Sequence, residues 1–223
     1  MADGKHVNAF QKGIKFWNSW RKDHPAVQPD FCRFDFSRCN LVGADLHNAD
    51  LSNAEFEGAI LGHRPLPAFM SRAGGPANLA GADLTHANFP GADLNHVNLR
   101  GAIMEKVDLR RAILRGACLD RADLTEAFLD HADLSRASLK KSGLTKAQLV
   151  EADLRDATLE GATLIEAHLA NANLQGANLS LTDLTGADLT GANLESSDLS
   201  RALLVDSRLA GATLIGARIY GIS

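Results

Sequence analysis

The chain has 223 residues, 45% of them apolar, and a net charge of −4, so it can bury a core and its charge alone identifies no partner. Only 5% of the residues are aromatic, and Ala and Leu dominate the apolar part, which predicts a narrow and uniform interior. No apolar stretch approaches the roughly 18 residues of a membrane span, and the N-terminus is too polar for a secretory signal. The three cysteines follow no metal-ligand spacing, so we expect a reducing, cytoplasmic location and no membrane contact.

The first predicted element is an N-terminal helical cap, residues 1–28. Apolar residues recur at helical spacing within residues 6–22 and predict one amphipathic helix; they are Val7, Phe10, Ile14 and Trp17. Pro25 and Pro29 end this helix. We expect the helix to cover the first part of the array that follows, because the end of a repeat array exposes unpaired edges.

A period of five residues governs almost all of the remaining chain. From Leu79 to Ile219 every fifth residue is Leu, Phe, Met or Ile, which gives 29 consecutive units. Seven more units, in another register, run from Phe31 to Leu61. Ala stands two positions before most of these residues, with Asp or Asn between them. The consensus is A-(D/N)-L-x-x.

This period excludes a simple helix or strand. Five residues advance an α-helix by about 500°, which would scatter the leucines around the axis. Five is also odd, so a flat strand would place successive leucines on opposite faces. All of them can face one core only if the chain bends once per unit, and such coils stack about 4.8 Å apart. The Asp or Asn before each Leu suits the bend, because its short side chain can bond to nearby backbone.

The pattern resembles the pentapeptide-repeat family. The resemblance implies an all-β fold, a right-handed quadrilateral β-helix in which four units make one square coil, with Leu and Ala inward and the last two residues of each unit outward. The 36 units would then give nine coils. We assign residues 29–61 to the first repeat coils, 77–219 to the main solenoid and 220–223 to a C-terminal tail, with truncation of a longer chain as an open alternative.

Residues 62–76 form a predicted inserted loop. The separation of Leu61 and Leu79 is not a multiple of five, and the segment between them carries three Pro and three Gly. Its apolar centre either folds back on the rod or meets a partner. In the quinolone-resistance branch of the family, projecting loops contact DNA gyrase, so the resemblance implies that this loop could bind a partner. The candidate contact residues are Arg64, Leu66, Phe69, Met70 and Arg72.

Charge is unevenly distributed along the array. Residues 100–146 carry a net charge of +3, and stacking of the coils predicts a basic column; its members are Arg100, Arg121, Lys140 and Lys141. Residues 156–200 contain seven carboxylates and no Lys or Arg. Glu160, Glu166 and Glu195 occupy outward positions and are candidate partner contacts. For the Asp residues of the consensus position we favour backbone capping over partner contact. For the basic column we favour a solvated face over a nucleic-acid binding surface.

The apolar C-terminal end predicts an end-on homodimer or a missing C-terminal domain. The candidate dimer residues are Leu203, Val205, Ile215, Tyr220 and Ile222.

No sequence motif indicates catalysis. The carboxylates follow the repeat, the eight His residues are dispersed, and no phosphate loop, nucleophile elbow or metal signature occurs. We therefore expect no catalytic residue, metal or cofactor. The leading hypothesis is a non-enzymatic rod that binds an unidentified protein partner. The alternative is a DNA mimic that binds DNA gyrase or topoisomerase IV. Direct nucleic-acid binding is disfavoured because no aromatic residues interleave with the basic column.

Overall fold

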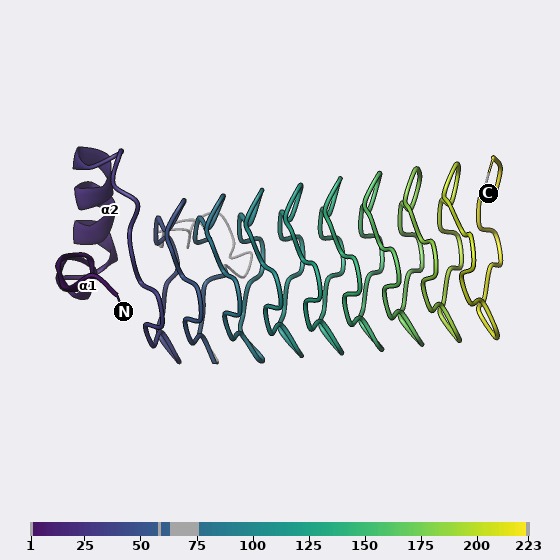
Figure 1. Ribbon diagram of the computed structural model, residues 1–223, viewed down its shortest axis with the longest axis horizontal. Helices are drawn as coiled ribbons and strands as arrows, with labels where there is room; N and C mark the ends of the chain where they lie inside the picture. The colour runs from purple at the N-terminus through teal and green to yellow at the C-terminus, as the bar shows by residue number, and fades with distance from the viewer. Residues whose placement is uncertain (1, 58, 63–75, 222–223) are drawn as a thin grey trace, which may run out of the picture.

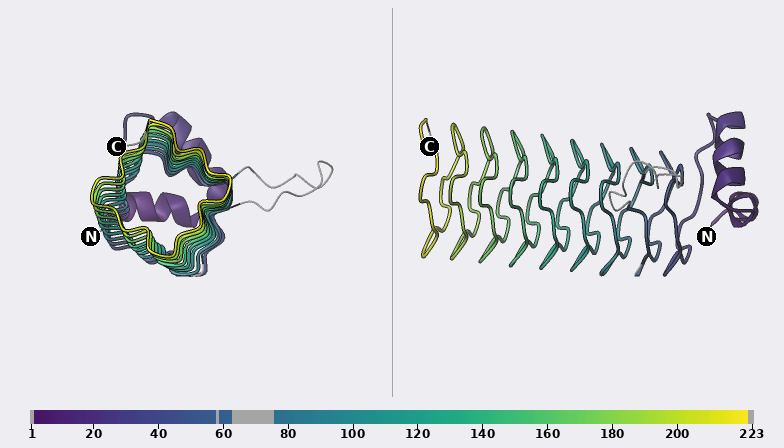
Figure 2. Two further views of the ribbon diagram at one scale, coloured as in Figure 1. Left: turned by 90° about the vertical axis from the view of Figure 1, so that its right-hand side faces the viewer. Right: turned by 180° about the vertical axis from the view of Figure 1, so that it is seen from behind.

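The computed structural model describes residues 2–57, 59–62 and 76–221 (Figure 1). Two helices, α1 (Gly4–Gln11) and α2 (Ile14–Asp23), lie at one end, and the rest of the described chain winds into a straight stack of coils. Viewed along its axis, the stack has four sides (Figure 2). Adjacent coils pair through isolated parallel bridges, and the described residues contain no longer strand.

Each coil is made of four pentapeptides. Along the main array each bridged residue pairs with the residue 20 positions later, as Asp133 does with Asp153, and successive bridges are five residues apart. Each pentapeptide therefore forms one side of the coil. We number the four sides by their inward Leu residues in one central coil: sides 1, 2, 3 and 4 carry Leu119, Leu124, Leu129 and Leu134. Each corner takes the number of the side that precedes it, so corner 1 follows Leu119 and corner 4 follows Leu134.

The bend at each corner comes from a residue in the left-handed backbone region. This residue stands two positions after the inward Leu, as at Arg136, where φ is 59°. The N–H of Ala137 donates to the C=O of Leu134 at 3.0 Å and closes the turn. The turn comprises the four residues from Leu134 to Ala137, and a positive φ at the third of them is characteristic of a type II turn. Glycine adopts this conformation most readily, yet 22 corner residues are not glycine, so the coil tolerates a side chain there.

Two inward side chains per unit fill the interior. Ala137 and Leu139 are each 0% exposed, and the same holds within 1% for the Ala and Leu positions from Leu41 to Ala202. Burying one such Leu contributes about 1.5–3 kcal/mol relative to leaving it in water. The sequence prediction of a narrow Ala and Leu core is confirmed.

The Asp and Asn residues of the consensus stabilise the corners. Asp133 Oδ1 accepts hydrogen bonds from the N–H and the hydroxyl of Ser135 at 3.1 and 2.6 Å. Asp188 makes the same pair of bonds with Thr190, at 3.1 and 2.6 Å. Such local bonds favour turns over regular strands, which confirms the role predicted for this position.

The N-terminal segment forms two short helices, which is consistent with the predicted helical cap, although a single helix was expected within residues 6–22. The chain breaks at Gly13, whose φ is 101°, a conformation that favours glycine. The apolar stripe nevertheless continues across the break. Phe10 from α1 and Trp17 from α2 both pack edge-on against Phe31, with ring centroids 5.4 and 5.3 Å apart.

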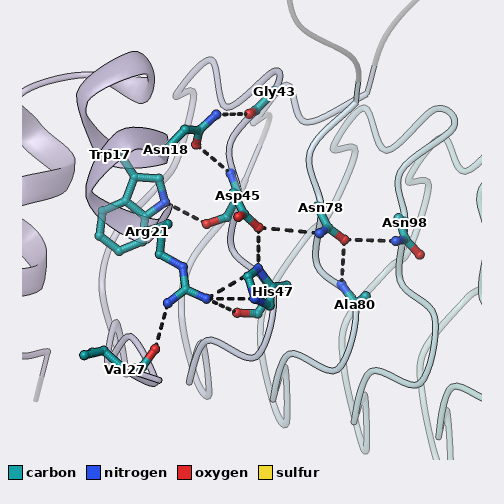
Figure 3. Close-up of polar contacts among 10 residues, drawn as sticks. All are labelled: Trp17, Asn18, Arg21, Val27, Gly43, Asp45, His47, Asn78, Ala80 and Asn98. Carbon is teal, nitrogen blue, oxygen red and sulfur yellow. Dashed lines mark hydrogen bonds and ion pairs between the residues drawn. The ribbon is translucent and has the colours of Figure 1, made fainter. Parts of the chain in front are cut away.

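Side chains of α2 supply the hydrogen bonds that a preceding coil would make on side 1 (Figure 3). Trp17 Nε1 donates to the C=O of Asp45 at 2.7 Å, and Asn18 Oδ1 accepts from the N–H of Asp45 at 3.0 Å. Arg21 donates to the C=O of His47 at 2.9 Å. In the array, backbone groups make the equivalent bonds; for example, the N–H of Ser138 donates to the C=O of Ala117 at 2.9 Å. The helix therefore replaces a coil on this side.

The insertion falls at corner 4 in the order of the chain. Asp45 is bridged to Asn78 at a sequence separation of 33 where the array has 20, so the coil contains 13 additional positions. The N–H of Ala77 donates to the C=O of Leu61 at 2.9 Å, which keeps the coil closed across the insertion.

Candidate interaction surface

The interior of the rod is filled, so any functional group must act from the outside. In residues 2–57, 59–62 and 76–221, no three His, Cys, Asp or Glu side chains are grouped as a metal site. Within the same residues, no helix is both long enough and apolar enough to cross a membrane.

The predicted loop contacts cannot be placed. Arg64, Leu66, Phe69, Met70 and Arg72 lie outside the described residues. Ile222 lies outside them as well. The other four residues of the predicted apolar end are exposed, and Ile215 and Tyr220 most strongly, at 72% and 68%.

The predicted single basic column is wrong, because the register of the coils divides it into two adjacent columns at corner 1. Arg100 and Lys140 lie in the first column, with Asp120 between them. Arg121 and Lys141 are consecutive in the second column. The two columns meet where the N–H of Arg121 donates to the C=O of Lys140 at 2.9 Å. The coil of Arg121 thus lies between the coil of Arg100 and the coil of Lys140 and Lys141, so the four cations span two coil steps.

The acidic residues of the distal third do not form one acidic face. They occur on several sides and corners, and five of the seven lie within 4 Å of a cation. These pairs are Asp156 with Arg136, Glu160 with Lys140, Glu166 with Lys146, Asp188 with Arg208, and Asp198 with Arg218. Glu195 instead accepts a hydrogen bond from Gln175 at 3.3 Å. The candidate residues Glu160, Glu166 and Glu195 therefore lie on three different corners, each with a neighbour on the rod.

Several carboxyl groups are held in the charged form. Burial acts to raise the pKa of Asp153, but the hydrogen bonds and the positive charge of Arg155, together with the charge of Arg115, lower this pKa overall. The Thr190 hydroxyl is the main cause of the lowered pKa of Asp188. A general acid needs a carboxyl pKa raised towards neutrality, so these two groups are suited to structural pairing and not to proton donation.

Sequence reasoning missed a hollow on corner 4. It has a volume of about 940 Å³, and its lining includes His96, Arg115, Arg136, Arg155 and Asp156. Arg155 is paired with Asp153 at 2.5 Å and Arg115 with Asp133, whereas Arg136 is 3.9 Å from Asp156. Reading the sequence in rows of four pentapeptides would have placed these corner residues together.

Comparison with known proteins identifies the repeat. A family model described as pentapeptide repeats matches eight copies, at residues 30–62, 77–116, 117–156, 152–191 and 187–223. No curated protein matches the chain. Among solved structures, the chain is similar to HetL from the cyanobacterium Nostoc sp. strain PCC 7120, a pentapeptide repeat protein involved in heterocyst differentiation regulation. The two are 29% identical, with a TM-score of 0.61, and the match covers 92% of this chain and 95% of HetL. QnrB1, a plasmid-mediated fluoroquinolone resistance protein, is 23% identical in a trypsin-treated form, with a TM-score of 0.46 over 85% of this chain and 81% of QnrB1. The family match and the likeness to HetL support a right-handed β-helix.

Proposed function

The chain belongs to the pentapeptide-repeat family, and we propose that it is a non-enzymatic rod that binds a protein partner through its outer surface. The filled interior is the observation that carries this proposal. Inward residues such as Leu139 and Ala137 are 0% exposed, so the interior offers none of the concave, partly apolar space that enzymes and small-molecule receptors generally use. A regular array of exposed side chains is what this fold offers a partner.

The solved relatives give limited support. HetL is described as involved in the regulation of heterocyst differentiation. A regulatory role is compatible with a protein that acts by binding, and we extend only that general role to this chain.

Cross-linking from the four corners of one coil tests the proposal. Arg121, Glu126, His131 and Arg136 are all exposed and all occupy the left-handed slot, with φ between 56° and 61°. A photo-reactive amino acid placed at each position in turn, in the native cells, should cross-link a specific protein from one or two corners. Failure at every corner, or equal cross-linking of many abundant proteins from all four, would contradict a defined binding surface.

A DNA-mimicking modulator of gyrase or topoisomerase IV is the second candidate. The observation that favours it is the absence of Lys and Arg from residues 156–200, which carry seven carboxylates. The cations within 4 Å of five of these carboxylates weaken it, because a duplex presents an uncompensated row of charges. A supercoiling assay with and without a quinolone decides the matter: inhibition or protection at micromolar protein supports the mimic, and no effect removes it.

A homodimer through the C-terminal end is a further part of the proposal. The exposure of Ile215 and Tyr220, at 72% and 68%, supports it. Light scattering coupled to size exclusion should show a dimer that the substitution Ile215→Lys converts to a monomer. A monomer in the unsubstituted protein would refute it.

A further inference from the structure

Corner 1 carries three cations that have no carboxylate within 4 Å among the described residues. We define the corner 1 patch as Arg100, Arg121, Lys140 and Lys141. Of the ten Lys and Arg in residues 100–146, six lie within 4 Å of a carboxylate. Among the described residues, the other four are Arg100, Arg111, Arg121 and Lys141, and three of these belong to the patch. Unpaired positive charge is thus concentrated on one corner.

The fold does not require these side chains. The left-handed slot of corner 1 holds Gly101 one coil before Arg121 and Gly161 one coil after Lys141, and both glycines have φ between 64° and 66°. Glycine suits this backbone better than any residue with a Cβ. Arg121 and Lys141 also place like charges on consecutive coils, which is unfavourable between neighbouring strands. Corner 2 shows the opposite arrangement, because Lys106 lies 3.6 Å from Glu126 on the next coil.

The side that leads into this corner carries no opposing charge. On side 1 the Asp/Asn position of the consensus, between the inward Ala and Leu, holds no carboxylate from Asn78 to Asn178. Over the same coils this position holds Asp123 on side 2, Asp108 on side 3 and Asp133 on side 4. The single carboxylate within the patch, Asp120, is turned onto the rod, where it accepts from Ser138 Oγ at 2.6 Å and from the N–H of Lys140 at 3.1 Å. Lys140 is 3.7 Å from Glu160 at the end of the patch.

From these observations we propose that the corner 1 patch, with side 1 beside it, is the docking surface for a carboxylate-rich segment of a protein partner. This inference rests on the proposed function of the rod. The patch extends over two coil steps, roughly 10 Å, which matches about three residues of an extended peptide. Arg side chains hold carboxylates through paired, charge-assisted hydrogen bonds. Binding should therefore weaken as salt rises.

The size and composition of the patch favour an acidic protein segment over a nucleic acid. A duplex-binding protein can contact about 6–10 phosphates through its Lys and Arg side chains. The patch has only four cations, which is fewer than such a footprint requires. Proteins that bind single strands stack the bases on aromatic side chains. The Asp/Asn position of side 1 holds no aromatic residue from Asn98 to Thr158.

The test compares two matched arginines. Arg111 is exposed and, like Arg121, has no carboxylate within 4 Å among the described residues. It occupies the same corner position with φ of 59° against 61°, and it lies on the diagonally opposite corner. Binding of a fluorescent glutamate-rich peptide to the full chain is measured by anisotropy at low and at physiological salt, beside duplex and single-stranded oligonucleotides. We expect Arg121→Glu to weaken peptide binding at least about tenfold and Arg111→Glu to change it by less than about twofold.

A second variant separates binding from folding. Arg121→Gly removes the charge and relaxes the left-handed backbone, so it should raise the unfolding temperature and still weaken peptide binding. Equal losses in Arg121→Glu and Arg111→Glu, no peptide binding at low salt, or tighter binding of either oligonucleotide would each overturn the inference. If the photo-reactive residues cross-link a partner only from other corners and the peptide does not bind at corner 1, the proposed binding function is supported and this docking surface is rejected.

Discussion

The hydrogen bonds of Asn18 give the sharpest test of how the cap completes the rod. The Asn18 carboxamide accepts from the N–H of Asp45 at 3.0 Å and donates to the C=O of Gly43 at 2.7 Å. The substitution Asn18→Ala removes both partners at once. An unsatisfied buried backbone group costs about 1–3 kcal/mol, and both groups here are only partly buried, so we expect a loss of about 2–4 kcal/mol in the local opening free energy.

Hydrogen exchange measures this loss where it occurs. With about 1.4 kcal/mol per factor of ten, amide protection in the first coils should fall roughly 30- to 1,000-fold. Coils far along the array should keep their protection, because each repeat contacts only its neighbours. The matched control is Asn8→Ala on α1, an exposed residue for which no side-chain hydrogen bond occurs among the described residues. Unchanged protection near Asp45, or an equal loss near residue 150, would refute the reasoning.

Three further predictions concern the core, the corners and the insertion. Ala137→Leu should overpack the filled interior and lower the free energy of unfolding by about 1–3 kcal/mol in denaturant titrations; an unchanged value would mean that the interior has unused space. The lowered pKa of Asp188 adds stability above the pKa of the unfolded chain, and this is lost as pH falls through the folded pKa. Asp188→Asn should therefore lower the unfolding temperature at neutral pH by a margin that shrinks in acid, whereas a margin independent of pH would contradict the assignment. Deleting residues 64–76 removes the 13 additional positions and should preserve the coil, as judged by circular dichroism. Deleting residues 63–75 should destabilise the coil, because Pro76 would then occupy the corner position two residues after Leu61, which needs a positive φ.

The period of five residues was sufficient to predict the coil. A bend in every unit is the only way to bring Leu79, Leu84 and their successors into one core, and the structure buries them at 0% exposure. The break at Gly13 was not predicted, because an apolar stripe at helical spacing continues through it and only the backbone angle shows the interruption. The role of Asn18 was equally hidden, since its partners, Asp45 and Gly43, lie far along the sequence, at separations of 27 and 25.

The arrangement of surface charges was predicted less well than the fold. Residue counts gave the basic middle and the acidic distal third correctly, but one column was assigned where the register forms two. Counts along the chain cannot show that Glu166 lies 3.6 Å from Lys146 on the previous coil. Pairing across coils depends on the register of the stack, and that register determines which charges remain for a partner.

Every pentapeptide of the array turns its last two residues outward and closes the interior with its first and third. Maleimide labelling of single cysteines along one unit, Ala132, Leu134, Ser135 and Arg136, in a background without native cysteines, tests it most directly. We expect rapid labelling at Ser135→Cys and Arg136→Cys and strong protection at Ala132→Cys and Leu134→Cys, whose native residues are 1% and 0% exposed. Rapid labelling at both inward positions in the folded protein would mean that the interior is open to solvent, and the proposal of a rod that acts only from its outside would fail.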